Sequence, residues 1–280
     1  MCMNTKLYKI CYEPSQFSSI GLGFDPWDNS INAAPDLREF PVFEIAYKSA
    51  LTKDLDYWGL LSPKFEKKSG ITGEQFLNWI DAMNKTNPCD VYFINPVPIV
   101  EAIFPGTIQH GNNCHPGLLD LLQRNITGAK NIDLSVLYMD ANTFSMCNYF
   151  VGNRKFWDKY IDFVKRFLWQ LNTNDYNMVY NVGANYGPNK TLPYYTFAVE
   201  RLFSIFLHLH GSEIKVANYR YDRAALLLKT GLPEIIIDEL IALSDIKNIA
   251  LSGRQPHMLQ HWAFFRNRLC QQNPYLFHIE

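Results

Sequence analysis

The sequence predicts an α/β fold in which helices cover both faces of a mostly parallel central sheet, followed by a helical C-terminal part. Short apolar runs alternate with amphipathic helical patterns through the first hundred of the 280 residues. Right-handed crossovers between parallel strands would bring the polar residues that end these runs to one edge of the sheet, where such folds bind ligands. No repeat or low-complexity linker divides the chain, so we expect one large domain with a helical extension.

Three strands and two helices are expected in the first hundred residues. The strand runs are Leu7–Tyr12, Tyr57–Leu61 and Asp90–Pro96. Apolar residues recur at helical spacing from Leu37 to Leu51, with Asp36 as a candidate cap. Proline is tolerated only in the first turn, so this helix is expected to begin at Phe40 or Pro41. Thr72 opens the second helix with a capping-box pattern.

The rest of the chain is less regular. We expect a long polar loop from Phe104 to Gly117, two short apolar runs between Leu134 and Phe150, and a glycine-rich loop at Gly183–Gly187. Helices are expected at Pro116–Gln123, Phe156–Leu171, Tyr194–His208, Pro233–Ile246 and His257–Leu269. We place a boundary between residues 1–218, which would hold the sheet and the site, and residues 219–280, which would pack on them as a helical extension.

Composition and charge argue against several classes of protein. A net charge of −1 provides no bulk attraction to nucleic acid. The six cysteines form no C-x-x-C pair, which is typical of free thiols in a reducing compartment. No apolar run approaches the ~20 residues of a membrane span, and the first residues lack the apolar segment of a signal peptide. We therefore expect a cytoplasmic protein.

A serine and several lysines follow the second predicted strand, in the stretch SPKFEKK. Ser62, Lys64, Lys67 and Lys68 would stand at the carboxyl end of that strand, where compact cations could face the phosphates of a ligand. An exposed helix start is the more usual setting for such a run of lysines.

Two short acidic stretches resemble the D-x-D pattern that holds a divalent cation against a diphosphate. Asp54 and Asp56 have the right letters, but they precede their strand and would lie at the opposite edge of the sheet. Asp140 follows an apolar run, but its partner is an amide, Asn142. The sequence therefore leaves the use of Mn²⁺ or Mg²⁺ open.

The stretch HGNNCHPG brings together His110, Cys114 and His115, which are possible zinc ligands. No further pair completes a set of four at a usual spacing. A substrate-binding loop that ends at a helix start is the favoured interpretation, and a zinc-dependent hydrolase is the alternative.

Glu200 and Arg201 lie in the first two turns of a strongly apolar helix, AVERLFSIFLHLH. A carboxylate at the edge of such a helix can take a proton from an attacking hydroxyl, because its surroundings tune its pKa. A Glu-Arg pair stabilised by the helix dipole is the structural alternative.

Four segments, in this order, carry a resemblance to a known family: PDLREF, DYWGLLSPKF, NYFVGNRKFWDKY and FAVERLFS. Their pattern and order resemble those of GT-A-like bacterial glycosyltransferases encoded in capsule and O-antigen clusters, and the group that includes galactofuranosyltransferases is most similar. The resemblance covers about Leu7 to His210. That group carries a His-Tyr-Arg-Arg segment after its second strand, and Ser62 to Phe65 stand there in this chain. This departure puts the donor sugar and the use of metal in doubt.

The resemblance implies a Rossmann-type nucleotide-binding domain that transfers a sugar from a nucleotide sugar, with a UDP-sugar as the expected donor, to a saccharide or lipid-linked acceptor. We expect Glu200 to be the general base if the reaction inverts the anomeric centre. Tyr12, Ser62 and Asn95 are expected to frame the nucleotide, and Lys64 and Lys67 to lie near the diphosphate. Arg201 is expected among the residues that bind the donor. Asp140, Asn142 and Asn148 are expected to contact the donor sugar or a metal, and His115 and Trp157 the acceptor.

Two alternatives stay open at this point. The chain could be a non-catalytic carbohydrate- or partner-binding protein with the same fold, since it lacks a convincing D-x-D. The helix His257–Leu269 carries aromatic residues with Arg266 and Arg268, which suits either a core helix with a basic rim or the inner face of a membrane. The sequence does not disclose the acceptor, the stereochemical outcome or the oligomeric state.

Overall fold

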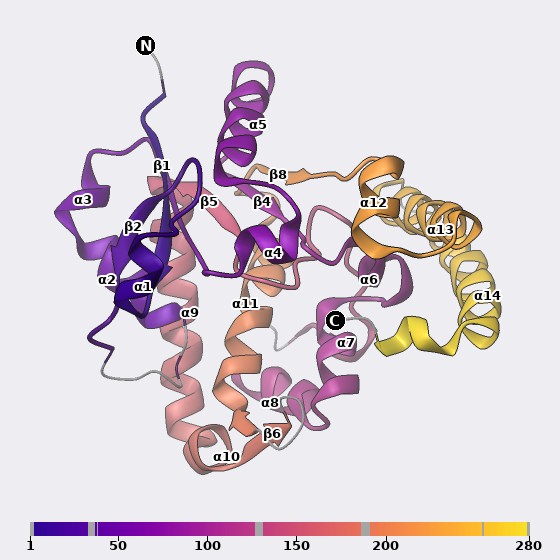
Figure 1. Ribbon diagram of the computed structural model, residues 1–280. Helices are drawn as coiled ribbons and strands as arrows, with labels where there is room; N and C mark the ends of the chain where they lie inside the picture. The colour runs from indigo at the N-terminus through magenta and orange to yellow at the C-terminus, as the bar shows by residue number, and fades with distance from the viewer. Residues whose placement is uncertain are drawn as a thin grey trace.

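The computed structural model describes residues 3–32, 37, 39–126, 131–185, 191–253 and 255–278 (Figure 1). Asp36 and Gly187, which the sequence singled out as a helix cap and as part of a glycine-rich loop, lie outside these residues.

A six-stranded sheet forms the centre of the described part of the chain, in the order β2-β1-β3-β5-β4-β8. Its strands are β1 (Thr5–Cys11), β2 (Asp25–Asp28), β3 (Tyr57–Leu61), β4 (Val91–Ile94), β5 (Phe150–Asn153) and β8 (Val216–Tyr219). β5 runs antiparallel to its neighbours β3 and β4, while the pairs β1–β2, β1–β3 and β4–β8 are parallel. The predicted mostly parallel α/β sheet is therefore confirmed. The parallel strands all end at one edge, and β5 begins there.

Helices cover both faces of this sheet, because successive strand residues point to opposite sides. A larger hydrophobic cluster receives Tyr8, Ile10, Trp58, Leu60, Val91, Phe93 and Phe150, and a smaller one receives Leu7, Leu61, Tyr92, Ile94 and Val151. The helices that complete the larger cluster include α2 (Phe40–Lys48), α9 (Arg154–Asn174) and α11 (Tyr194–His210), and those that complete the smaller one are α4 (Phe65–Ser69) and α5 (Gly73–Thr86). Figure 1 shows α5 on the opposite side of the sheet from α9 and α11.

The remaining described elements connect or flank these layers. They are α1 (Pro14–Phe17), α3 (Ala50–Lys53), α6 (Pro98–Ile103), α7 (Thr107–Cys114), α8 (Leu118–Asn125), α10 (Tyr176–Asn181), α12 (Arg223–Thr230), α13 (Glu234–Ser252), α14 (Pro256–Gln272), the 3-10 helices Leu134–Val136 and Pro274–His278, and the antiparallel pair of β6 (Gly183–Asn185) and β7 (Thr191–Pro193).

Several local signals act as the sequence predicts. The α2 helix begins at Phe40 with Pro41 in its first turn, where a missing amide hydrogen costs nothing. Thr72 and Gln75 form both hydrogen bonds of a capping box at the start of α5. The helix α9 begins two residues before the predicted Phe156, and Asn153 caps it by accepting from the Phe156 amide at 3.0 Å.

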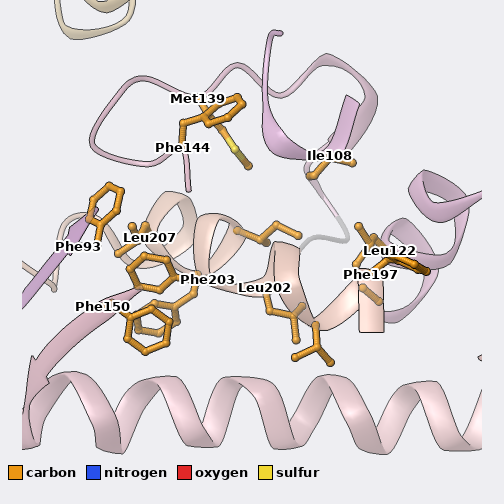
Figure 2. Close-up of a cluster of buried hydrophobic side chains, with 14 of the residues drawn as sticks. Phe93, Ile108, Leu122, Met139, Phe144, Phe150, Phe197, Leu202, Phe203 and Leu207 are labelled. Atoms are coloured by element: carbon orange, nitrogen blue, oxygen red, sulfur yellow. The ribbon is translucent and has the colours of Figure 1, made fainter. Parts of the chain in front are cut away.

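The helix α11 is enclosed on nearly every side. Each residue from Tyr194 to Leu207 is buried except Glu200. Figure 2 shows Leu202, Phe203 and Leu207 of α11 among buried side chains from several other elements. Phe93 and Phe150 come from the sheet, Ile108 and Leu122 from α7 and α8, and Met139 and Phe144 from the segment that precedes β5. Each such apolar side chain contributes ~1.5–3 kcal/mol to stability by its burial, so α11 makes a large contribution to the stability of the larger cluster.

The expected polar loop from Phe104 to Gly117 is wrong, because α7 occupies most of it. The sequence TIQHGNNC has weak intrinsic helix propensity, but Ile108, His110 and Gly111 lie on its buried face. Gly111 is required there, since a Cβ would lie 2.9 Å from Nε of the buried Arg201. Tertiary packing therefore determines this helix.

Three further features were not predicted from the sequence. The loop after the first strand contains β2, the apolar run Val136–Met139 forms no strand, and β8 with α12 precedes the two predicted C-terminal helices. β2 and β8 are four-residue strands at the two edges of the sheet, and such short runs carry little periodicity.

The C-terminal helices pack on the body through α6. α13 lies along α6, and α14 lies along α13. Lys247 of α13 is fully buried, and its ammonium lies 3.0 Å from Oε1 of Glu101 on α6. The ammonium also donates to the carbonyls of Glu101 and Phe104. A buried charge needs such partners, so this pair fixes α13 against α6.

Replacing Trp157 by alanine should lower the free energy of unfolding by about 3–5 kcal/mol, because the ring is fully buried and leaves a cavity. The rings of Trp157 and Trp58 are stacked with their centroids 3.8 Å apart, and the Trp157 indole donates to the Trp58 carbonyl at 3.1 Å. Urea denaturation measures the loss. The matched control is Trp169→Ala on the same helix, where the side chain is 64% exposed and a change within about 0.5 kcal/mol is expected. Equal losses in the two variants would contradict the packing described.

Candidate functional site

The candidate site lies at the edge where the parallel strands end. Tyr12 follows β1, Ser62 follows β3 and Asn95 follows β4. Because β5 is antiparallel, the residues before it, Asn148 and Tyr149, lie at the same edge, and the Ile94 amide donates to the Tyr149 carbonyl at 3.0 Å. The structure therefore places polar residues from several distant segments along one rim.

Ser62 and Tyr149 form one hydrogen-bonded pair of this rim. Their hydroxyl oxygens are 2.9 Å apart. Tyr149 is almost fully buried, and this burial raises the pKa of its phenol, so the group stays protonated and available as a donor.

Asn148 and Glu39 form a second pair. The Asn148 amide donates to Oε2 of Glu39 at 3.1 Å, and Glu39 stands at the N-cap of α2. Asn148 is 3% exposed, and its Oδ1 has no hydrogen-bond partner within the described ranges. A buried acceptor of this kind is costly unless a ligand or water reaches it.

Glu200 and Arg201 come to the same place from α11. Arg201 is buried, and its guanidinium donates to the Thr107 carbonyl at 3.1 Å and lies 3.3 Å from Oε2 of Glu200. The side chain of Glu200 is 39% exposed. The carboxylate is thus held by a buried cation but is open to solvent.

Cys147 connects these groups electrostatically. Burial raises the pKa of its thiol to about 12, an effect that the nearby Lys68 ammonium opposes and that the carboxylates of Glu200 and Glu39 increase. The same two carboxylates raise the pKa of Tyr149. Glu39 and Glu200, which are far apart in the sequence, therefore act on the same buried groups. We call Glu39, Ser62, Cys147, Asn148, Tyr149 and Glu200 the strand-end cluster.

The lysines near this cluster are exposed. Lys64 is the N-cap of α4, and Lys67 and Lys68 lie in its last turn. Nζ of Lys68 lies 3.7 Å from Sγ of Cys147, which places it beside the cluster. No ion pair involves Lys64 or Lys67 within the described part of the chain, and both are exposed in the segment that follows Ser62.

The predicted cluster of His110, Cys114 and His115 packs against α11. Burial lowers the pKa of His110 to about 3 and that of His115 to about 4, with the Arg201 charge adding to both effects. His115 stacks on Phe197 at 3.6 Å, and Sγ of Cys114 lies 3.9 Å from Nε2 of His110. Both imidazoles are neutral at physiological pH. No group of three or more His, Cys, Asp or Glu residues in the described ranges is arranged to hold a metal ion.

Two other predicted site residues do not join the strand-end cluster. Trp157 is fully buried in the core against Trp58, with no ring surface for an acceptor. Asp140 uses Oδ1 to accept from Asn142 N at 3.0 Å and from the Thr143 hydroxyl at 2.8 Å, which closes its own turn. Asn142 itself is exposed.

A separate cavity of about 350 Å³ opens at the carboxyl ends of β4 and β8. It is lined by Asn95, by Asn218 to Tyr221, and by residues of α6, α12 and α13. Ala141, which follows Asp140, also lines it. Asn95 thus borders the cavity, whereas Ser62, Lys64 and Glu200 do not.

Sequence reasoning missed Glu39, Cys147 and Tyr149 as site residues. The sequence assigns PDLREF only to a pattern and predicts Asn148 alone from CNYFV, although Glu39, Cys147 and Tyr149 also belong to the strand-end cluster. A tyrosine in the apolar run CNYFV is indistinguishable from a core residue until its partner, Ser62, is known.

Comparison of the chain with protein-family models, curated proteins and solved structures finds no match. None of the described helices combines the length and apolar character that crossing a membrane requires.

The free energy of unfolding should fall when the pH is lowered from 7.5 to 5, partly because of His110. Its pKa is about 3 in the folded protein and near 6.5 when unfolded, so the unfolded state binds more protons between these values. At pH 5 this imidazole alone should lower the free energy of unfolding by about 2 kcal/mol. Denaturant unfolding of His110→Gln at both pH values should show a correspondingly smaller fall than wild type. His257→Gln, at an exposed position, is the control. If the free energy of unfolding falls as much in His110→Gln as in wild type, the conclusion that His110 is buried in its neutral form is contradicted.

Proposed function

We propose that the protein is a nucleotide-sugar-dependent glycosyltransferase of cell-surface polysaccharide synthesis. The observation that carries the proposal is Glu200, the single side chain between Tyr194 and Leu207 that an otherwise buried helix leaves open to solvent. It stands beside buried groups at the ligand-binding edge of the sheet.

The connectivity of the sheet supports a nucleotide at the ends of β1 and β3. β1 leads on to β2 on one side of it, while its other neighbour β3 leads on to β4 in the opposite direction, so the connections that follow β1 and β3 diverge. Ligands of open α/β sheets bind in the crevice at such a point. Tyr12 and Ser62 follow these two strands, and the exposed Lys64 and Lys67 lie just beyond Ser62. This location suits a base and ribose followed by a diphosphate.

The segments that resemble the glycosyltransferase group also support the proposal, because they meet in space. Glu39 of PDLREF contacts Asn148, Ser62 of the second segment contacts Tyr149, and Glu200 of FAVERLFS acts on Cys147 and Tyr149. Residues that only serve separate elements have no reason to converge on one rim.

In the proposed reaction the acceptor hydroxyl attacks the anomeric carbon of the donor sugar. The bond from that carbon to the diphosphate oxygen breaks, and the nucleotide diphosphate leaves with the electron pair. Glu200 takes the proton of the attacking hydroxyl, and the lysines of α4 stabilise the charge of the leaving diphosphate. A UDP-sugar is the proposed donor. A divalent cation would assist at the diphosphate if Glu39 of the strand-end cluster supplied an oxygen ligand. Asp140, the ligand expected from the sequence, lies outside that cluster and closes its own turn. We place the activity in the cytoplasm, with a saccharide or lipid-linked acceptor.

Isothermal titration with uridine, guanosine and cytidine diphosphates, each with and without Mn²⁺, tests donor binding. We expect one nucleotide to bind, and Lys64→Gln combined with Lys67→Gln to weaken it several-fold by removing two charges near the phosphates. Lys53→Gln, at an exposed lysine of α3, is the control. The proposal fails if no nucleotide binds under any of these conditions.

Glu200→Gln should reduce turnover by about 10²–10⁴-fold and leave nucleotide affinity unchanged. Glutamine still offers Arg201 an acceptor oxygen, so the fold should be retained, as a thermal melt would show. Glu74→Gln, at an exposed position of α5, is the matched control and should behave as wild type. Unchanged turnover in Glu200→Gln would remove the general base from the mechanism.

A non-catalytic saccharide-binding protein is the second candidate, and the position of the cavity favours it, since Glu200 does not line that cavity. Such a protein would bind saccharides and show no nucleotide-dependent turnover in either the wild type or Glu200→Gln.

A further inference from the structure

The cavity at the carboxyl ends of β4 and β8 has two chemically different walls. α12 and α13 contribute an apolar wall, in which Leu226, Leu240 and Ile241 take part. Asn95 and Asn218 of the sheet and Ser244 and Asn248 of α13 contribute amides and a hydroxyl. A ligand that fits must therefore have both an apolar face and a set of hydrogen-bonding groups.

The polar wall is held rigidly by a hydrogen-bonded chain. Asn248 accepts from the Ala141 amide at 2.8 Å and donates to the Ser244 hydroxyl at 3.1 Å. Ser244 donates to Oε2 of Glu101 at 2.5 Å, and Glu101 pairs with the buried Lys247. Preformed polar walls of this kind reduce the entropy lost when a ligand binds.

The apolar wall is fixed as well. Arg223 at the start of α12 bridges to α13, with its guanidinium 2.6 Å from Asp238 and 2.9 Å from Glu234. Tyr221, which lines the cavity, donates its hydroxyl to the Ser69 carbonyl at 2.6 Å and so joins the cavity to α4.

The charges and the volume of the cavity limit the kinds of ligand that can bind there. Arg220 and Asp245 contribute one charge of each sign, both on exposed residues, and Glu101 and Lys247 compensate each other. A site for a phosphate would instead show an excess of cations. A volume of about 350 Å³ is at the low end of the ~300–1,000 Å³ usual for ligand pockets, which suits one or two sugar rings rather than a whole nucleotide sugar.

We propose that this cavity binds a saccharide ring, with the C–H face of the ring against Leu226, Leu240 and Ile241 and its hydroxyls toward the amides and Asp245. In a transferase this would be the acceptor side, a statement that rests on the proposed function. The saccharide binding itself does not depend on it.

The test fills the cavity from its apolar wall. Ile241 lines the cavity and is partly exposed, so Ile241→Trp should occupy the space with little effect on the core. Ile249→Trp is the matched control, because it lies on the same helix, is 52% exposed and does not line the cavity. Asp245→Ala, at an exposed position, is a second variant in case Ile241→Trp folds poorly.

The probes are the methyl glycosides of glucose, galactose, mannose, rhamnose and N-acetylglucosamine, followed by ligand-observed NMR titration. We expect at least one glycoside to bind wild type and Ile249→Trp equally, Ile241→Trp to bind it at least tenfold more weakly, and Asp245→Ala several-fold more weakly. Absence of binding to wild type, or unchanged affinity in both cavity variants, overturns the proposal.

Nucleoside diphosphates are titrated in parallel with the same proteins. If Ile241→Trp abolishes nucleotide binding, the cavity is a nucleotide site and the saccharide proposal is overturned. If a glycoside binds in the cavity but no nucleotide binds anywhere, the saccharide site stands and the transferase function fails.

Discussion

The burial of Arg201 is the constraint on which the candidate site depends. A guanidinium that is removed from water must find acceptors, and here they are the Thr107 carbonyl and the Glu200 carboxylate. The first contact requires α7 to approach α11 closely, which only glycine at position 111 permits. The second fixes a carboxylate at the surface of a helix whose other faces are filled with apolar side chains. The packing that buries Arg201 therefore also fixes the position of the proposed base, Glu200.

The antiparallel strand β5 has a comparable effect on the sheet. Inserted between β3 and β4, it brings the start of a strand to the edge where the other strands end. Asn148 and Tyr149 thereby face Glu39 and Ser62 across the rim. β5 fits because residue 59 of β3 is glycine, where a Cβ would lie 2.4 Å from the Phe150 carbonyl oxygen. A fully parallel sheet of the same strands would have placed these residues at the opposite edge.

Much of the fold could be predicted from the sequence where one local signal decided the outcome. The apolar run Tyr57–Leu61 is a strand with the predicted bounds, and the Thr72 capping box starts α5. The helix α7 could not be predicted, because its formation depends on Arg201 from a segment 90 residues away. The same distinction applies to the site. Glu200 stands out as a carboxylate in an apolar helix, whereas Tyr149 acquires its meaning from the Ser62 hydroxyl.

The strand-end cluster and the cavity are mechanically connected through α4. Nζ of Lys68 lies near Sγ of Cys147, while Tyr221 and Lys229 donate to the carbonyls of Ser69 and Lys68. The end of this five-residue helix therefore contacts both places, so a shift of α4 would change both of them. If a diphosphate draws Lys64 and Lys67 toward it, α4 must follow, and Tyr221 would carry that movement to the wall of the cavity.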